Sequence, residues 1–191
     1  MTPTELLAAL HTAEKLKDTT RHCYTSGGRH ESVAEHSWRI ALMAFFLRDA
    51  FPEADMDKVA RMCLIHDLGE CFTGDIPAFD KTAQDESREE QLLDRWVSSL
   101  PSPCREEMRM LYSEMAALKT QEAKIYKALD KLEAVISHNE SDISTWEDHE
   151  YDLQLTYGEQ NVAFSPYLGE LRQAIRQETL DKIAREGDRR K

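Results

Sequence analysis

The sequence is poor in cysteine, and its cysteines show none of the close spacing found in zinc-binding or redox motifs. This absence predicts reduced thiols in a cytoplasmic protein. Long apolar runs are also missing, because the longest, Ile40 to Leu47, falls far short of the roughly 18 residues of a membrane span. The N-terminus lacks the basic start and apolar centre of a signal peptide. We therefore expect no membrane partner. The four cysteines are Cys23, Cys63, Cys71 and Cys104.

A glycine-rich phosphate loop, an internal repeat and an excess of basic charge are absent as well. The formal net charge of -12 argues against a nucleic-acid polymer as partner, because such a partner requires a basic face. A small phosphorylated substrate remains compatible, since a bound cation and an arginine reverse the local field. A chain of 191 residues, 41% hydrophobic and 31% charged, has the size and composition of one globular domain.

Apolar residues recur at helical spacing over most of the chain, which predicts an all-α fold. We expect a single compact multi-helix bundle over residues 1–191, with a core at about residues 16–139 and C-terminal helices at about residues 144–186 packed on it. Asp18 to His30 is expected to be a loop because it is rich in Thr, Ser and Gly. We expect a first helix that ends near Lys17 and a last helix that begins at Pro166. Between them we expect helices from Ser32 to Leu47, Met56 to Leu68, Asp85 to Leu100, Ser102 to Leu118, Gln121 to Asn139 and Ser144 to Tyr157.

Two of these helices place histidines toward the interior. Ser32 followed by Glu35 predicts a capping box, and the apolar stripe that follows puts His36 on the buried face. The next helix is apolar on several sides and carries His66-Asp67 at its C-terminal end, where Gly69 is the expected stop signal. The helix of Asp130 is expected to keep that carboxylate off its main apolar stripe, with Lys124, Lys127 and Lys131 in a solvent-facing sector. His138 and His149 are expected at the surface or at helix ends.

His36, His66, Asp67 and Asp130 together offer two imidazoles and two carboxylates from three expected helices. An aspartate beside a histidine at the end of a nearly all-apolar helix is costly unless a positive charge meets it. The alternative is a pair of core histidines bonded to backbone carbonyls, with Asp67 as a helix-end cap. The mixed ligand set favours one divalent transition-metal ion per subunit (Mn, Co, Fe, Ni or Zn) over Ca or Mg. We therefore predict a metal-binding hydrolase.

Two further carboxylates are candidates for catalysis. Glu70 follows Asp67 by three residues, so a continued turn brings it to the edge of the metal site, where a carboxylate can move a proton. The alternative is a surface glutamate at a helix end. Asp75 has the alternative of a turn residue after Gly74.

Four stretches resemble the HD-domain phosphohydrolases: Glu31–Ser37, His66–Glu70, Gly74–Pro77 and Ala128–Leu132. The resemblance extends from about Leu16 to the helix of Asp130. It looks closest to the bacterial 5′-deoxynucleotidase branch and its eukaryotic relatives, which remove phosphate from deoxynucleoside 5′-monophosphates. It implies an all-helical, homodimeric phosphohydrolase of nucleotide metabolism acting on a nucleoside monophosphate. The same resemblance assigns the roles: His36, His66, Asp67 and Asp130 as metal ligands, Glu70 and Asp75 as catalytic residues, and Arg21 as the substrate-binding arginine.

One departure concerns the nucleoside. Well-known members of that branch have a tryptophan directly after the arginine, where this chain has His22, with Tyr24 nearby. Base and sugar preference therefore stay open.

Three other functions compete with this one. A guanosine polyphosphate hydrolase of the same superfamily would carry an acidic pair where Glu70 is followed by Cys71. Dinuclear relatives carry additional histidines, and none occurs from Leu68 to Leu129. A non-catalytic metal- or nucleotide-binding module is the third possibility, although all four ligands are intact.

Overall fold

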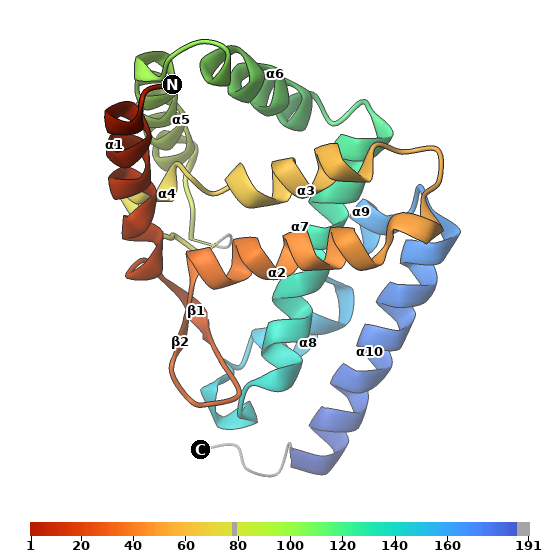
Figure 1. Ribbon diagram of the computed structural model, residues 1–191. Coiled ribbons are helices and arrows are strands. Elements are labelled where there is room, and N and C mark those ends of the chain that lie inside the picture. Colours follow the sequence, from red (N-terminus) through yellow and green to blue (C-terminus); the bar gives the residue numbers. More distant parts are fainter. Residues whose placement is uncertain (78–79, 187–191) are drawn as a thin grey trace.

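The computed structural model describes residues 1–77 and 80–186 (Figure 1). The elements are mainly α-helices, with one small hairpin near the N-terminus, so the expected all-α class is confirmed. Within the described ranges, none of the helices combines the length and hydropathy needed to cross a bilayer. The helices are α1 (Pro3–Ala13), α2 (Val33–Phe46), α3 (Met56–Ile65), α4 (Glu70–Thr73), α5 (Ala83–Ser99), α6 (Cys104–Ala117), α7 (Gln121–Glu140), α8 (Glu150–Thr156), α9 (Glu159–Val162) and α10 (Pro166–Glu186); the strands are β1 (Thr20–Tyr24) and β2 (His30–Ser32). Short 3-10 turns lie at Glu14–Lys17, Arg48–Ala50 and Ile143–Thr145.

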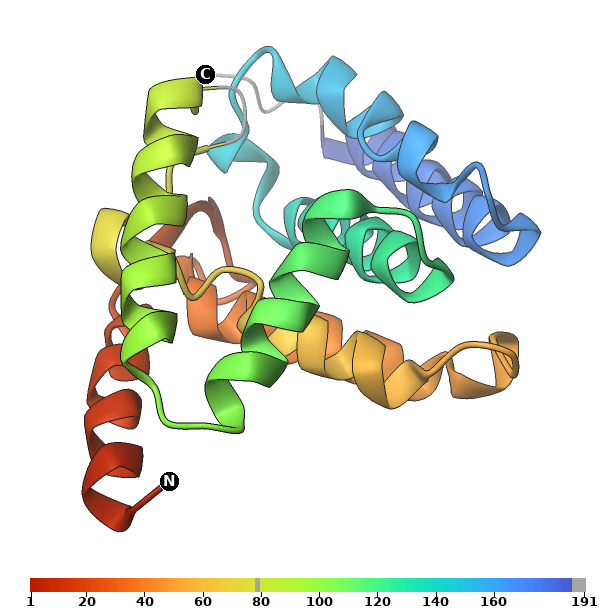
Figure 2. The same cartoon turned by 90° about the horizontal axis from the view of Figure 1, so that it is seen from above.

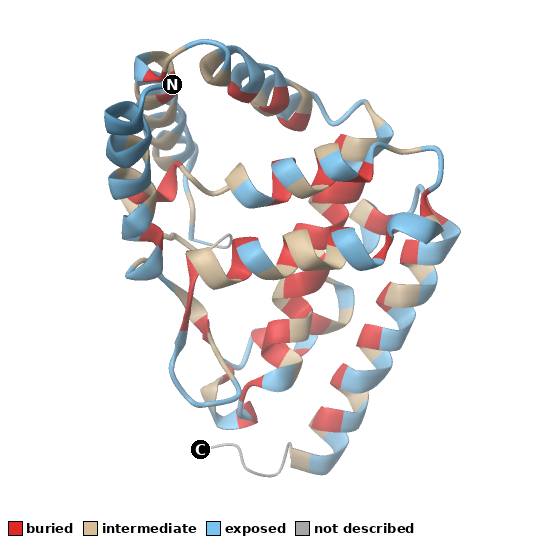
Figure 3. Cartoon of the chain, viewed as in Figure 1, coloured by how far each residue is buried: buried red, intermediate tan, exposed pale blue. Residues whose placement is uncertain are grey.

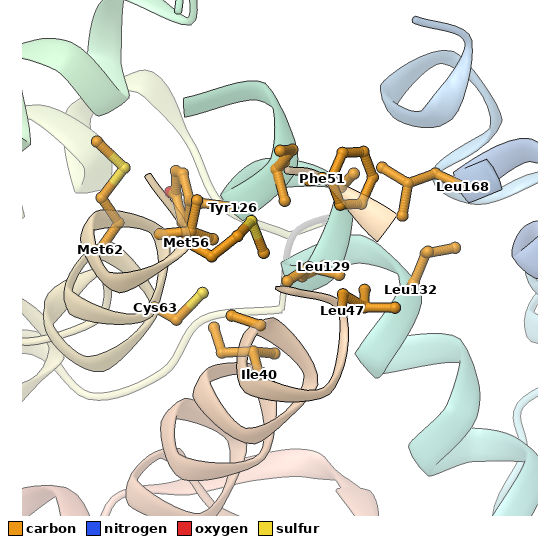
Figure 4. Packing of buried hydrophobic residues seen from close by; sticks show 14 of the residues in the cluster. Ile40, Leu47, Phe51, Met56, Met62, Cys63, Tyr126, Leu129, Leu132 and Leu168 are labelled. Carbon is orange, nitrogen blue, oxygen red and sulfur yellow. The ribbon is translucent and has the colours of Figure 1, made fainter. Parts of the chain in front are cut away.

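Helix α7 is the central element, and α2, α3 and α10 pack against it (Figures 1 and 3). It begins at the cap residue Thr120, whose Oγ1 accepts a hydrogen bond from the amide of Ala123 at 3.2 Å. Leu129 and Leu132 are fully buried on it, and each such side chain contributes about 1.5–3 kcal/mol of hydrophobic stabilisation. Figure 4 labels part of the core around it: Ile40, Leu47, Phe51, Met56, Met62, Cys63, Tyr126, Leu129, Leu132 and Leu168.

The start of α2 agrees with the prediction. The hydroxyl of Ser32 accepts from the amide of Glu35 at 3.3 Å, and the Glu35 carboxylate accepts from the amide of Ser32 at 2.9 Å. This reciprocal capping fixes the first turn of the helix, and His36 lies one turn further on with no exposed surface. The predicted buried position of His36 is therefore confirmed.

Helix α3 ends at Ile65, three residues before the predicted end. The hydroxyl of Tyr112 donates to the carbonyl of Ile65 at 2.6 Å, and the chain then tightens into turns with the amide of Leu68 bonded to the same carbonyl at 3.1 Å. His66 and Asp67 therefore leave the helix as part of a bend, which turns both side chains toward α7.

Gly69 is not the stop signal that the sequence suggests. It precedes α4 with an ordinary helical φ of -59°. A Cβ at this position would lie 2.6 Å from Cγ of Glu89 on α5. A residue larger than glycine at this position would therefore displace the side chain of Glu89.

The predicted loop from Asp18 to His30 is also wrong in its first part, because β1 and β2 pair as an antiparallel hairpin. The register pairs Thr20 with Ser32 and Tyr24 with His30. Gly28 closes the turn with a φ of 81°, a conformation that favours glycine. Arg21 and His22 are thereby held on a strand beside α2 and α7.

The predicted helix from Ser144 to Tyr157 is broken. Trp146 is extended, with ψ 138°, and its ring N–H donates to the carbonyl of His138 at 3.1 Å. A new helix, α8, starts only at Glu150. Helix α1 ends at Ala13, and a 3-10 turn continues to Lys17, the predicted end of the first helix. Every residue of α1 is at least partly exposed at the edge of the molecule (Figures 2 and 3).

Candidate metal centre

The bend after α3 brings His66 and Asp67 to the side chains of His36 and Asp130. The Nε2 atom of His66 lies 2.9 Å from Oδ2 of Asp67 and 3.8 Å from Oδ1 of Asp130. The Nε2 atom of His36 lies 3.9 Å from the same Asp67 oxygen and 3.4 Å from the same Asp130 oxygen. Donor atoms held about 2.0–2.2 Å from one ion lie about 3 to 4 Å apart, so the four side chains have the spacing of a common coordination sphere.

Each histidine is oriented through its other ring nitrogen. Nδ1 of His36 donates to the carboxylate of Glu133 at 2.5 Å, and Nδ1 of His66 donates to the carbonyl of Cys63 at 2.9 Å. Because both acceptors lack a proton, both Nδ1 atoms carry the hydrogen. The Nε2 lone pairs are then directed toward Asp67 and Asp130. This arrangement is typical of histidines that ligate metals.

The residues fit a cation because the buried polar atoms at the centre are otherwise unsatisfied. Among the described residues, Nε2 of His36 and Nε2 of His66 are buried without a hydrogen-bond partner. Burial and the charge of Arg21 lower the pKa of His36, but the neighbouring carboxylates of Asp130 and Glu133 outweigh them and raise it to about 9. The raised pKa indicates that the carboxylates of the centre stabilise a positive charge there. A divalent ion would supply that charge.

Asp130 divides its two oxygens between the centre and two lysines. Its Oδ1 faces the histidines, whereas Oδ2 lies 2.9 Å from Nζ of Lys127 and 3.5 Å from Nζ of Lys131. Burial raises the pKa of Asp130, yet the two lysines and His36 hold it well below its usual range. The prediction of a solvent-facing lysine sector is therefore wrong for Lys127 and Lys131, which line the cavity beside the centre.

A cavity of about 480 Å³ opens beside the two carboxylates. Asp67, Asp130, Glu70, Asp75 and Arg21 all line it. His36 lies beneath this wall with no exposed surface. The residues predicted to bind metal, to catalyse and to bind substrate are thus brought to one place.

Burial disfavours the charged forms of Glu70 and Asp75. Burial, followed by the charges of Asp67 and Asp75, raises the pKa of Glu70 to about 10, and one of its buried oxygens has no hydrogen-bond partner among the described residues. Burial and the charge of Asp67 also raise the pKa of Asp75. A Glu70 that is 6% exposed does not fit the surface alternative, whereas Asp75 follows Gly74 outside any helix or strand, as the turn alternative has it, and also lines the cavity.

Arg21 reaches the cavity from β1. Its side chain is 12% exposed, and Nε lies 3.5 Å from the buried carboxylate of Glu31. Burial lowers its pKa, but the charges of Glu133 and other neighbours outweigh that effect and raise it, so the guanidinium stays charged. Nε has no hydrogen-bond partner among the described residues, which leaves an N–H group for an anion.

The sequence analysis missed Glu133, which is fully buried one turn beyond Asp130. Besides His36, it contacts the hydroxyl of Ser137 at 2.7 Å and Nε of Arg39 at 3.7 Å. A carboxylate three residues from a lysine-flanked aspartate carried no signal of its own, because its partner lies 97 residues away in the chain.

Glu133→Gln is expected to weaken binding of the transition metal by about 10- to 100-fold, because His36 loses the charge that orients it and raises its basicity. Competition between the protein and a chromogenic chelator measures this affinity. Glu140→Gln is the matched control, since Glu140 lies on the same helix and also pairs with Arg39, but at the surface. Equal affinity in Glu133→Gln and the native protein would contradict the assignment.

Two other residues missed by the sequence are His138 and Glu150. His138 lies at a helix end, as one of its two predicted positions has it, but it is 5% exposed and lines the cavity with Glu150. Their contact joins the end of α7 to the start of α8, and sequence periodicity carries no information on such a pairing.

Known proteins share this architecture. Residues 13–172 match the HD domain family. Human 5′-deoxynucleotidase HDDC2 is 33% identical over 139 residues, which are 71% of this chain and 67% of that protein. The structure of a predicted metal-dependent phosphohydrolase from Magnetospirillum magnetotacticum MS-1 is 31% identical, with a TM-score of 0.79 over 94% of this chain and 93% of that one. A cyanophage S-2L HD phosphohydrolase bound to dA and one catalytic Zn²⁺ ion is 21% identical, with a TM-score of 0.52 over 92% of this chain and 94% of that one, which shows likeness of fold alone.

The fold and the centre define an all-α protein in which two imidazoles and two carboxylates converge on the wall of a cavity. The match over residues 13–172 and the identity with the human relative specify the family. This chain belongs to the HD domain family.

Proposed function

We propose that this protein is a metal-dependent phosphoric monoester hydrolase that removes phosphate from nucleoside or deoxynucleoside 5′-monophosphates, in the manner of a 5′-nucleotidase. The observation that carries the proposal is the pair of buried Nε2 atoms without a partner among the described residues, facing Asp67 and Asp130 beside a cavity that also holds a charged arginine. The names of the relatives support the substrate class, since those from human and mouse are both called 5′-deoxynucleotidases.

His36, His66, Asp67 and Asp130 would hold one divalent transition-metal ion per subunit. The donor set suits Mn, Co, Fe, Ni or Zn. Such an ion supplies Lewis acidity toward a phosphate and lowers the pKa of water. The chain's own contribution is to fix the four donors, which it does through Glu133, the Cys63 carbonyl and the two lysines on Asp130.

The remaining residues would bind phosphate and move protons. Arg21 holds the phosphate through charge-assisted N–H contacts. Asp75 orients the attacking water and accepts the proton that the water releases. As the bond between phosphorus and the new oxygen forms and the bond to the 5′-oxygen breaks, Glu70 gives its proton to the departing 5′-oxygen. Its raised pKa keeps that proton in place at neutral pH. The products are a nucleoside and inorganic phosphate.

A phosphate-release screen tests the proposal. The metal-free protein is reconstituted with Mn, Co or Zn and incubated with ribo- and deoxyribonucleoside 5′-monophosphates. Release from at least one monophosphate, and none from matched nucleoside 3′-monophosphates, is expected. Release from guanosine polyphosphates alone would replace the proposed substrate class, and no release from any nucleotide would favour a non-catalytic module.

Arg21→Ala is expected to raise KM for the monophosphate by about 10- to 100-fold, because a charge-assisted contact contributes about 1.5–3 kcal/mol. Metal content should not change, since Arg21 is not among the donors. Steady-state kinetics and metal analysis on the same preparation measure both. Arg29→Ala is the control, because Arg29 lies on the same hairpin with its side chain 63% exposed. Loss of the metal in Arg21→Ala would contradict this role.

The single domain over residues 1–191, the homodimer and the cytoplasmic location remain predictions. The preference for base and sugar stays open, because His22, with Tyr24 nearby, stands where well-known relatives have a tryptophan.

A further inference from the structure

A second group of metal-ligating side chains lies on the wall of the same cavity. His22, His138 and Glu150 all line it. Nε2 of His22 lies 3.0 Å from Oε1 of Glu150, and Nε2 of His138 lies 2.8 Å from that same oxygen. The three donor atoms all lie within 4.8 Å of one another. None of these residues belongs to the centre formed by the histidines and aspartates of α2, α3 and α7.

Three separate elements build this group, which makes it a property of the folded chain. His22 comes from β1, His138 from the last turn of α7 and Glu150 from the first turn of α8. The side chains of Glu150 and His138 are 3% and 6% exposed, while that of His22 is 33% exposed toward the cavity. Two donors are therefore fixed in the protein interior and the third faces the space that a ligand would enter.

The buried members are oriented as metal ligands are. Nδ1 of His138 lies 2.8 Å from the carbonyl of Ala134, and a carbonyl only accepts, so Nδ1 carries the hydrogen. The other oxygen of Glu150 accepts from the amide of Glu147 at 2.7 Å, which fixes the carboxylate plane. The histidines of the first centre are fixed through Nδ1 in the same way, one by a carbonyl and one by a carboxylate.

One carboxylate oxygen is the meeting point of the group. Nε2 of His22 and Nε2 of His138 both face Oε1 of Glu150, and the centroids of the two rings lie 5.1 Å apart. A cation shared by these three atoms would take the place of the hydrogen bonds that join them.

The donor set and spacing match a known class of site. Two histidines and one glutamate form the three-ligand zinc site that leaves a coordination position open. Donors about 2.0–2.2 Å from one ion are separated by about 2.9–3.5 Å at tetrahedral or octahedral angles, and both donor pairs that include Glu150 lie close to this range. The partial exposure of His22 directs the open side toward the cavity.

We propose that His22, His138 and Glu150 form a second site for a divalent transition-metal ion, of the two-histidine, one-carboxylate class, on the cavity wall beside the first centre. Its open positions accept an oxygen donor from a ligand in the cavity, away from the group held at Asp67 and Asp130. The site is separate from the proposed phosphohydrolase activity and does not depend on it.

Metal stoichiometry tests the proposal. Tag-free protein is stripped with a chelator, titrated with Zn²⁺ or Co²⁺ by calorimetry, and analysed for bound metal after gel filtration. The native chain is expected to bind two ions per chain. His22→Ala and Glu150→Gln should each bind one, and Asp67→Ala should also bind one. Glu150→Gln combined with Asp67→Ala should bind none.

Matched controls and a spectrum separate the new site from general disturbance. His149→Ala and Glu147→Gln replace the same residue types beside α8, where both side chains are largely exposed, and should still bind two ions. Circular dichroism checks that each variant is folded, and His22→Ala removes the most exposed of the three donors if Glu150→Gln fails this check. In Asp67→Ala, Co²⁺ should give visible absorption bands that disappear when His22 is also replaced.

One ion per native chain would overturn the second site, as would two ions in folded His22→Ala and Glu150→Gln. The proposed phosphohydrolase fails separately, through absence of phosphate release from a protein that binds both ions.

Discussion

Asp67→Ala is expected to abolish phosphate release and to remove one bound metal ion per chain. The Asp67 carboxylate faces both unpartnered imidazole nitrogens, at 2.9 Å from His66 and 3.9 Å from His36. A bound cation contributes several kcal/mol to transition-state stabilisation, so its loss corresponds to a fall in kcat/KM of at least about 1,000-fold. His66→Ala should have the same result, since it removes the other member of the pair from the same bend.

Metal analysis and phosphate release, measured on one preparation of each variant, check this expectation. Asp57→Ala is the matched control because Asp57 lies on α3 with its side chain 72% exposed and pairs with Arg48. It should keep both its metal and its activity. Full turnover in Asp67→Ala or His66→Ala would contradict the centre, whatever the metal content.

Where local sequence determined the structure, prediction from the sequence succeeded. Ser32 and Glu35 cap α2 by bonding each other's backbone within four residues, so the start of the helix and the buried position of His36 follow from local pattern. Likewise, the helical periodicity of α7 predicted the element that carries Asp130. The convergence of the four donors themselves was inferred from residue chemistry and resemblance, and the structure brings those side chains together.

Where a distant partner decided the outcome, the sequence carried no signal. Helix α3 ends early because Tyr112, 47 residues further on, bonds the carbonyl of Ile65. The hairpin depends on pairing between two short strands, and Gly69 is explained by Glu89 on α5. Lys131 faces the cavity because its Nζ donates to the hydroxyl of Tyr157, 26 residues further on, and both Lys127 and Lys131 lie beside Asp130.

The histidines also differ in whether local sequence or a distant partner determines their position. His36 sits on an apolar stripe, which periodicity detects. His138 lies in the last turn of its helix, a position that ordinarily is exposed, and it is buried because the chain returns through Trp146 and Glu150 to cover it. The group formed by His22, His138 and Glu150 could therefore be found only from the folded structure.

Glu70→Gln is expected to retain the metal and lower kcat by about 100- to 10,000-fold, which is the usual contribution of a positioned general acid or base. Glutamine has nearly the same shape and is neutral, as the buried Glu70 is when its pKa stands at about 10, so the fold should tolerate the change. What the variant loses is the proton for the departing 5′-oxygen. KM should change little, because Arg21 and the metal centre still hold the phosphate.

A change of leaving group separates Glu70 from Asp75. An aryl phosphate departs as a stable phenolate and needs no proton, so the deficit of Glu70→Gln should shrink by at least about 10-fold on such a substrate, whereas the deficit of Asp75→Asn should persist if Asp75 orients the water. The reverse pattern would exchange the two roles. Glu140→Gln, a surface change on α7, should match the native enzyme on both substrates. Native kcat in Glu70→Gln on a nucleoside monophosphate would show that the buried carboxyl takes no part in proton transfer, and its raised pKa would then reflect burial alone.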